Sequence, residues 1–232
     1  MIGARLQGME ILLRTALAPC LVLLVSAVAR RSGPRLGGLL LGVPMTSVPF
    51  AMLVWLDAGS GAAARAARGL AAAQLAVACF CLAYGRLAPA LRPARALAVA
   101  LTSTAVAAAA AATCPNVWLT AVGALAVTCA GLATWPPLPP AGRPVTRRVS
   151  PGREVGTRMA LSAVTIPLAM TAARALGPFA AGVLAAFPVL LAVMAPATHR
   201  ATGPQAVAVM MRAALTVVPG TLAFLLLLSV AL

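Results

Sequence analysis

Residues 177–188 read GPFAAGVLAAFP, and residues 33–44, which lie 144 positions earlier, read GPRLGGLLLGVP. Both stretches fit the pattern G-P-x-x-x-G-x-L-x-x-x-P without a gap. The matched positions are Gly33 with Gly177, Pro34 with Pro178, Gly38 with Gly182, Leu40 with Leu184, and Pro44 with Pro188. The register continues outward to Arg14 with Arg158, Gly59 with Gly203, and Arg68 with Arg212. An internal repeat therefore organises the chain.

The composition places both copies in a lipid bilayer. The chain has 232 residues, of which 62% are hydrophobic, and its mean hydropathy is +1.00. So few polar residues do not cover the surface of a water-soluble globule. A hydrocarbon core of about 30 Å takes roughly 20 residues per helix. The chain is therefore expected to be an all-α integral membrane protein with no room for a sizeable soluble domain.

Breaks at Arg, Pro and Gly clusters divide the chain into eight apolar runs, each long enough to span a bilayer. They are residues 11–29, 36–56, 69–87, 94–112, 116–135, 159–176, 178–197 and 206–231. The fourth and fifth runs are separated only by residues 113–116, where Pro115 and Asn116 favour a tight turn. The run 11–29 resembles a secretory signal, but its pattern returns at 158–174, so we expect a retained helix.

The charges support this count of spans. All 18 basic residues are Arg, against the acids Glu10, Asp57 and Glu154, and the formal net charge is +15. Thirteen Arg follow the first, third, fifth and seventh runs, whereas Arg5, Arg14, Arg65, Arg68 and Arg174 fall on the other side. An excess of Arg marks the cytoplasmic side, which predicts that both termini lie outside. Arg between apolar runs indicates a lipid bilayer as the partner, not nucleic acid.

The repeat predicts two inverted halves. The first run of one copy corresponds to the sixth run of the chain, and an odd offset reverses the orientation of the second copy. We expect an N-terminal half over residues 1–135, a Pro/Arg-rich cytoplasmic linker over 136–157, and a C-terminal half over 158–232. The alternative is that duplication only provides a stable way to pack helices.

Paired prolines provide candidate hinges. Pro34 and Pro178 suit the first turn of a helix, whereas Pro44 and Pro188 come ten residues later, about 15 Å deeper, near the bilayer centre. A proline there bends the helix and leaves a carbonyl unpaired, which is tolerated beside protein or water. The candidate pathway or hinge residues are Pro44, Thr46, Ser47, Gln74 and Pro188. Hydroxyls such as those of residues 102–104 belong to this group unless they bond their own backbone.

The remaining polar residues favour gating over catalysis. Asp57 ends the second run, and His199 and Arg200 end the seventh, so these three are candidate gate residues, with solvated helix ends as the alternative. No acid lies inside a run, which disfavours a cation-coupling site. One His and three scattered acids leave no set of catalytic groups, so we expect no enzyme. Five cysteines in or beside apolar runs form neither a disulfide framework nor a metal set, and no cofactor is expected.

The residues Gly182-x-Leu184-x-x-Phe187-Pro188, followed by Thr198-His199-Arg200-x-x-Gly203, resemble a family of small, uncharacterised bacterial multi-pass inner-membrane proteins. The resemblance includes residues 33–47 and weakens across 90–157. It implies a location in the bacterial inner membrane and assigns no activity or site.

These features together predict a transporter or permease for a small neutral, anionic or lipid-like solute. It would work by alternating access about Pro44 and Pro188. The alternative is a non-transporting scaffold or partner subunit that acts through Arg-rich cytoplasmic loops, in particular Arg147, Arg148 and Arg153.

Overall fold

The computed structural model describes residues 39, 47–114, 116–137, 171 and 175–232. All regular elements of this part are helices. They are α3 (Ser47–Ala58), α4 (Ser60–Ala72), α5 (Gln74–Leu87), α6 (Pro93–Thr113), α7 (Val117–Ala133), α9 (Pro178–Ala185), α10 (Val189–Thr202) and α11 (Pro204–Ala231). Four stretches of this part, 60–87, 93–113, 178–202 and 204–231, are long and apolar enough to cross a membrane. The expectation of a helical membrane protein is confirmed at this level.

Two helical stretches of equal length form the centre of the bundle. Helices α4 and α5 together run over Ser60–Leu87, and α11 runs over Pro204–Ala231, each with 28 residues. At 1.5 Å per residue each is about 42 Å long. The two stretches begin 144 positions apart and also end 144 positions apart. The bounds of the central helices therefore follow the register of the sequence repeat.

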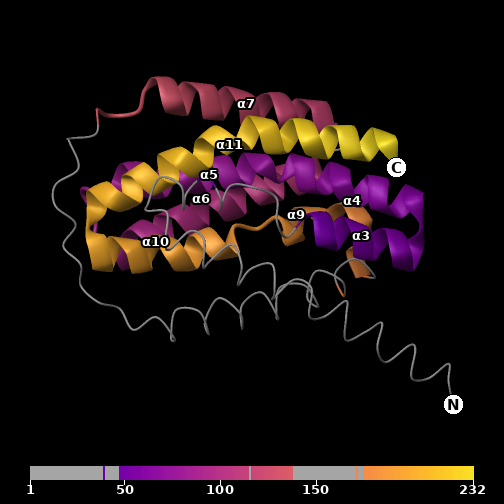
Figure 1. Ribbon diagram of the computed structural model, residues 1–232, viewed down its shortest axis with the longest axis horizontal. Coiled ribbons are helices and arrows are strands. Elements are labelled where there is room, and N and C mark those ends of the chain that lie inside the picture. The colour runs from indigo at the N-terminus through magenta and orange to yellow at the C-terminus, as the bar shows by residue number, and fades with distance from the viewer. Residues whose placement is uncertain (1–38, 40–46, 115, 138–170, 172–174) are drawn as a thin grey trace, which may run out of the picture.

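These two central stretches pack antiparallel (Figure 1). A Cβ atom added to Gly85, near the end of α5, would meet Met211, near the start of α11. Leu70 of α4 shares a core cluster with Leu222 and Leu225, near the end of α11. Each end of one stretch therefore lies beside the opposite end of the other.

Glycine turns connect each central stretch to the helix before it. Gly59, between α3 and α4, has φ 79° and ψ 177°, and Gly203, between α10 and α11, has φ 92° and ψ 173°. This combination is restricted to glycine, because any side chain would clash with the backbone. The α3–α4 turn and the α10–α11 turn lie at opposite ends of the bundle (Figure 1). We name these the Asp57 end and the His199 end.

A separate hydrophobic cluster fills each half of the bundle. One cluster, toward the His199 end, includes Phe80, Tyr84, Leu191 and Met211. The other, toward the Asp57 end, includes Phe50, Leu70, Leu222 and Leu225. Residues 144 positions apart occupy the two clusters in pairs: Phe50 and Met194, Ala51 and Ala195, Ala63 and Val207, Ala66 and Met210, Leu70 and Ala214, Ala71 and Leu215, Ala78 and Leu222, and Cys81 and Leu225.

Helices α4 and α9 cross at backbone contact. A Cβ atom at Gly69 would collide with the carbonyl oxygen of Phe179, and one at Gly182 would collide with the carbonyl oxygen of Ala66. Small residues permit such close approach of helices within a membrane. Gly182, one of the matched positions of the repeat pattern, lies at this crossing, and Gly33, Pro34 and Gly38 lie outside the described residues. Pro178 begins α9 at the first helical position, as predicted, after Gly177 with φ 87°.

The boundaries of several predicted spans need correction. The run 69–87 was expected to follow a loop with Arg65 and Arg68, but the helix begins at Ser60 and both Arg side chains are exposed on it. Arg212 likewise lies inside α11. An Arg does not end a membrane helix, because its apolar stem follows the helix surface toward the headgroups. Since side chains tilt toward the helix N-terminus, Arg68 reaches toward the Asp57 end and Arg212 toward the His199 end.

The predicted turn between the fourth and fifth runs is confirmed. Helix α6 ends at Thr113 and α7 begins at Val117. The side chain of Asn116 caps α7, because its Oδ1 accepts hydrogen bonds from Trp118 N at 3.0 Å and Leu119 N at 3.4 Å. The run 11–29, nearly all of 159–176, and residues 138–157 of the linker lie outside the described residues.

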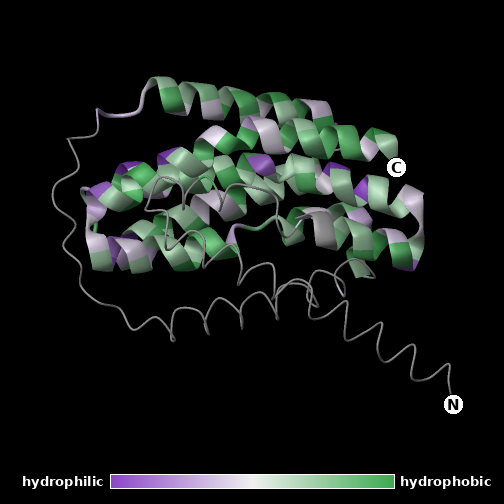
Figure 2. Ribbon diagram, viewed as in Figure 1, coloured by the Kyte–Doolittle hydropathy of each residue, from purple (hydrophilic) through white to green (hydrophobic). Residues whose placement is uncertain are grey.

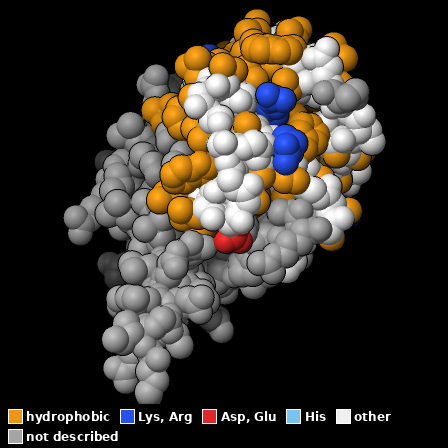
Figure 3. All heavy atoms as spheres, turned by 90° about the vertical axis from the view of Figure 1, so that its right-hand side faces the viewer, with side chains coloured by type: hydrophobic (Ala, Val, Ile, Leu, Met, Phe, Trp, Pro, Cys, Tyr) orange, Lys and Arg blue, Asp and Glu red, His pale blue; other side chains and the backbone are white. Residues whose placement is uncertain are grey.

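Hydrophobic residues predominate along the described helices (Figure 2), and many of the large ones are exposed. On α7 alone, Trp118, Leu119 and Val122 are each more than 60% exposed. Figure 3 looks onto the Asp57 end, where hydrophobic side chains dominate the described surface around small acidic and basic areas. The described charged residues nearest this end are Asp57, Arg65 and Arg68. An apolar exterior of this extent is typical of a protein that faces lipid.

We expect Gly69→Ala and Gly182→Ala each to destabilise the protein by about 1–3 kcal/mol, because the added methyl group forces apart two backbones in contact. Thermal unfolding of the detergent-solubilised protein measures the loss. Gly220→Ala in α11 is the matched control, since a Cβ there meets no atom within 4 Å. Equal melting temperatures for all three variants would contradict the close crossing of α4 and α9.

Candidate functional site

Three irregularities of the backbone lie at one depth in the bundle. The stretch Ser60–Leu87 is interrupted at Ala73, the segment from Ala186 to Pro188 separates α9 from α10, and α11 contains Pro219. Counted at 1.5 Å per residue, Ala73 is about 20 Å from Ser60, Val189 about 21 Å from Gly203, and Pro219 about 22 Å from Pro204. Each distance is about half the length of a central stretch. One helix break, at Pro188, and two irregularities within continuous stretches therefore lie at mid-depth.

The break before α10 is a sharp turn at Pro188. Its φ of −77° and ψ of 56°, with a hydrogen bond of 2.7 Å from Val189 N to the Phe187 carbonyl, define an inverse γ-turn. The carbonyl of Leu184 accepts a hydrogen bond from Phe187 N at 3.1 Å. These two bonds give the carbonyls of Phe187 and Leu184 a partner beside the break, which lowers the cost of a joint inside an apolar environment. Pro44, the other predicted hinge, and Thr46 lie outside the described residues.

The predicted pathway residues at mid-depth bond their own helices. Gln74 is buried, and its Nε2 donates to the carbonyl of Leu70, four residues earlier, at 3.3 Å. The hydroxyls of residues 102, 103 and 104 all donate to carbonyls one turn back in α6. Ser47 is buried at the start of α3. The alternative that hydroxyls satisfy their own backbone therefore holds for these three α6 residues.

His199 is buried, and it contacts Tyr84. His199 is only 8% exposed and Tyr84 is 0% exposed. The Tyr84 hydroxyl lies 3.4 Å from His199 Nδ1, and the two rings meet edge to face with centroids 6.0 Å apart. Phe80 stacks on the other side of Tyr84, also at 6.0 Å. His199 is therefore buried, and not exposed to solvent at its helix end as the alternative interpretation expected.

Sequence reasoning missed Tyr84. It lies in the third apolar run, where an aromatic residue reads as an ordinary packing residue. One signal was available, because the chain has a single Tyr and a single His. Nothing in the sequence brings positions 84 and 199 together, since the contact depends on α5 and α10 both contributing residues to the same cluster.

The other predicted gate residues lie at the two ends. Asp57 is exposed in the last turn of α3, and Arg200 is exposed in the last turn of α10. Arg86, Arg92 and Arg95 accompany Arg200 at the His199 end. Under the positive-inside rule this grouping favours the His199 end as the cytoplasmic one.

Arg86 links two helices at the His199 end. Its guanidinium donates to the carbonyl of Gly131 at 3.2 Å and to the Thr134 hydroxyl, both at the end of α7. A cation that satisfies the last carbonyls of a helix also complements the negative end of its dipole. Arg86 therefore attaches α7 to α5.

The described part of the chain holds no group of three His, Cys, Asp or Glu placed to bind a metal ion. Its cysteines, Cys79, Cys81, Cys114 and Cys129, are unpaired with one another. Comparisons with protein-family models, curated proteins and solved structures find no match to this chain.

We expect Arg86→Met to lower the free energy of unfolding by about 1–2 kcal/mol, because it removes two hydrogen bonds to the end of α7 and keeps the apolar stem. Thermal unfolding measures the stability, and limited proteolysis near residues 134–137 measures the attachment of α7. Arg95→Met, a change of the same kind at an exposed position of α6, is the control. If both variants behave alike, Arg86 does not attach α7.

Proposed function

We propose that the protein is a membrane transporter or permease built from two inverted halves and working by alternating access. The observation that carries the proposal is the antiparallel pairing of Ser60–Leu87 with Pro204–Ala231. Their matching bounds, their matching glycine turns, and the pairwise correspondence of the two core clusters support an inverted repeat. Two such halves around a site at mid-depth are the plan of many secondary transporters.

The two clusters act as closures of opposite ends. Alternating access requires a seal at each end that opens while the other is shut. The cluster with Phe80 and Met211 closes the His199 end, and the cluster with Phe50 and Leu225 closes the Asp57 end. Between them lie the break at Pro188 and the two other backbone irregularities. The γ-turn at Pro188 separates α9, which packs on α4, from α10, which packs on α11 and α6, so it is the joint about which α10 tilts.

The solute is small and neutral, anionic or lipid-like. The described charges within the long helices are all Arg, and Arg repels cations. They are Arg65, Arg68, Arg86, Arg95, Arg200 and Arg212. The acids of the chain are Glu10, Asp57 and Glu154, and Asp57 lies at a helix end. The proposed location is the bacterial inner membrane, on the family resemblance of residues 33–47 and 182–203.

Flux in proteoliposomes tests the proposal. A panel of neutral, anionic and lipid-like solutes is expected to include one that crosses with the protein present. Pro188→Ala is expected to slow that flux by about tenfold or more, because a continuous helix is favoured over a proline-broken one by about 3 kcal/mol. Pro93→Ala is the matched control, since a proline at the first position of α6 disturbs no helical hydrogen bond.

Two results would overturn transport. One is the absence of flux for every solute in the panel, together with an unchanged cellular phenotype for Pro44→Ala and Pro188→Ala. The other is the absence of labelling by a water-soluble thiol reagent at single cysteines placed over 44–47 and 188–192.

A scaffold that binds a partner or organises lipid through its cytoplasmic Arg is the second candidate. The grouping of Arg86, Arg92, Arg95 and Arg200 at one end favours it. Loss of the phenotype on charge reversal at Arg147, Arg148 and Arg153, with Pro188→Ala unaffected, would decide for the scaffold.

A further inference from the structure

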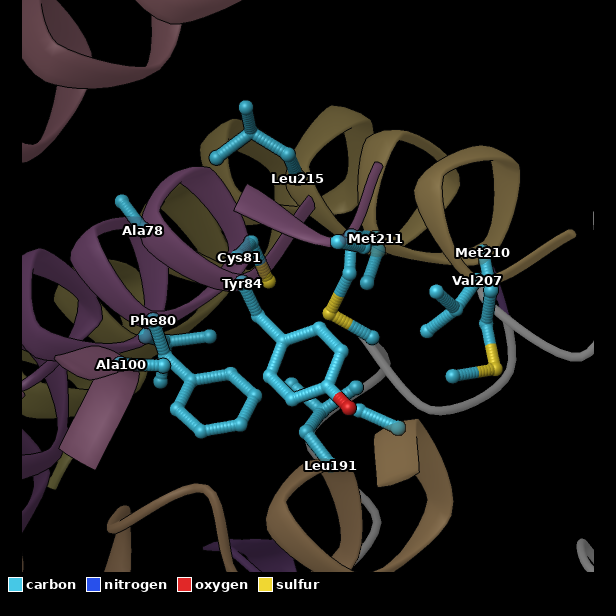
Figure 4. Packing of buried hydrophobic residues seen from close by; sticks show 14 of the residues in the cluster. Ala78, Phe80, Cys81, Tyr84, Ala100, Leu191, Val207, Met210, Met211 and Leu215 are labelled. Atoms are coloured by element: carbon cyan, nitrogen blue, oxygen red, sulfur yellow. The ribbon is translucent and has the colours of Figure 1, made fainter. Parts of the chain in front are cut away.

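The single Tyr and the single His of the chain join α5 to α10 inside an apolar cluster. Tyr84 and His199 are 115 positions apart, and the hydroxyl lies 3.4 Å from the imidazole Nδ1. Figure 4 shows the Tyr84 ring reaching from α5 between Met211 of α11 and Leu191 of α10. Inside the cluster each polar group is the other's partner, so the pair favours the closed arrangement about fivefold, the net contribution of one neutral hydrogen bond of about 1 kcal/mol.

The contact lies near the C-terminal end of α10, three residues after Pro196 in the interior of that helix. Helix α10 runs from the γ-turn at Pro188 to the glycine turn at Gly203. His199 is ten residues after Val189, so it is about 15 Å from the γ-turn. A small rotation about Pro188 therefore moves His199 much farther than it moves Val189. The Tyr84 contact is thus placed where it most restricts a tilt of α10.

The opposite end of the bundle has different chemistry at the same positions. A shift of 144 positions relates Tyr84 to Leu228 and His199 to Trp55. The same shift relates Thr198, whose hydroxyl points to Met210 Sδ at 3.7 Å, to the buried Val54. Where the His199 end has a hydroxyl and an imidazole, the Asp57 end has apolar side chains.

We propose that the Tyr84–His199 contact is a latch that holds the His199 end closed, and that the Asp57 end closes through the apolar cluster with Phe50 and Leu225, against which Leu228 packs. The inference rests on the proposed function, because it assigns the Tyr84–His199 contact to the gate at one end and the apolar packing to the gate at the other end. Its consequence is that removal of one hydroxyl shifts the opening of one end and leaves the other end unchanged.

A native cysteine, Cys81, can report the opening of the His199 end. Cys81 lies one turn before Tyr84 and is 0% exposed, so a thiol reagent reaches it only when the His199 end opens. A variant with Ala at positions 20, 79, 114 and 129 keeps Cys81 as the single thiol. Leu225, related to Cys81 by 144 positions and also 0% exposed, provides the matched reporter for the other end through Leu225→Cys with Cys81→Ala.

The measurement is the rate of labelling by a charged maleimide, with the protein in nanodiscs so that both faces meet water. Tyr84→Phe keeps the ring and removes the hydroxyl. It is expected to raise the labelling rate of Cys81 by about fivefold, the effect of one neutral hydrogen bond, and to leave the reporter at position 225 unchanged. His199→Phe is expected to act in the same direction, and the double variant to add little to either single one.

Leu228→Ala is the reciprocal control, and it is expected to raise labelling at position 225 and not at Cys81. Equal Cys81 labelling with and without the hydroxyl would overturn the latch. A Tyr84→Phe variant that labels both reporters faster would overturn it too, because that result describes general loosening. The assay needs no solute, so a failed latch shows in labelling, whereas a failed transport proposal shows in flux.

Discussion

The antiparallel packing of Ser60–Leu87 against Pro204–Ala231 is the constraint on which the described structure depends. Two stretches of 28 residues, each about 42 Å long, are enough to cross a hydrocarbon core of about 30 Å. Because lipid is as apolar as the side chains, packing between the helices must come from close fit. Alanine and glycine supply it, as at Gly69, where α9 approaches the backbone of α4 directly.

Every irregularity of these helices has to satisfy its backbone within the protein. An unpaired backbone group in hydrocarbon costs several kcal/mol. At Pro188 the γ-turn and the Phe187 N–H to Leu184 bond satisfy two carbonyls, and at Gln74 the side-chain amide adds a bond to the Leu70 carbonyl. The irregularities gather at mid-depth, where the two hydrophobic clusters adjoin. An irregularity in this place leaves the packing of both clusters continuous toward the ends of the bundle.

The two ends of the bundle are alike in architecture and unlike in chemistry. Gly59 and Gly203 make the same turn, and paired positions fill the two clusters. At the outer edge the residue types differ. Tyr84 and His199 lie at one end, and Leu228 and Trp55 occupy the positions related to them by 144 residues at the other end. This divergence is possible because different residues of the sequence form each end.

The sequence by itself determined the helical membrane class, the turn at Asn116, and the break at Pro188, because hydropathy, an N-cap and a proline act locally. It misplaced the start of the third span, since Arg65 and Arg68 read as a loop while their stems lie along α4. Only the tertiary structure decided that His199 is buried against Tyr84 and that Gly69 meets Gly182. Those contacts join positions more than a hundred residues apart, and their formation depends on which helices become neighbours.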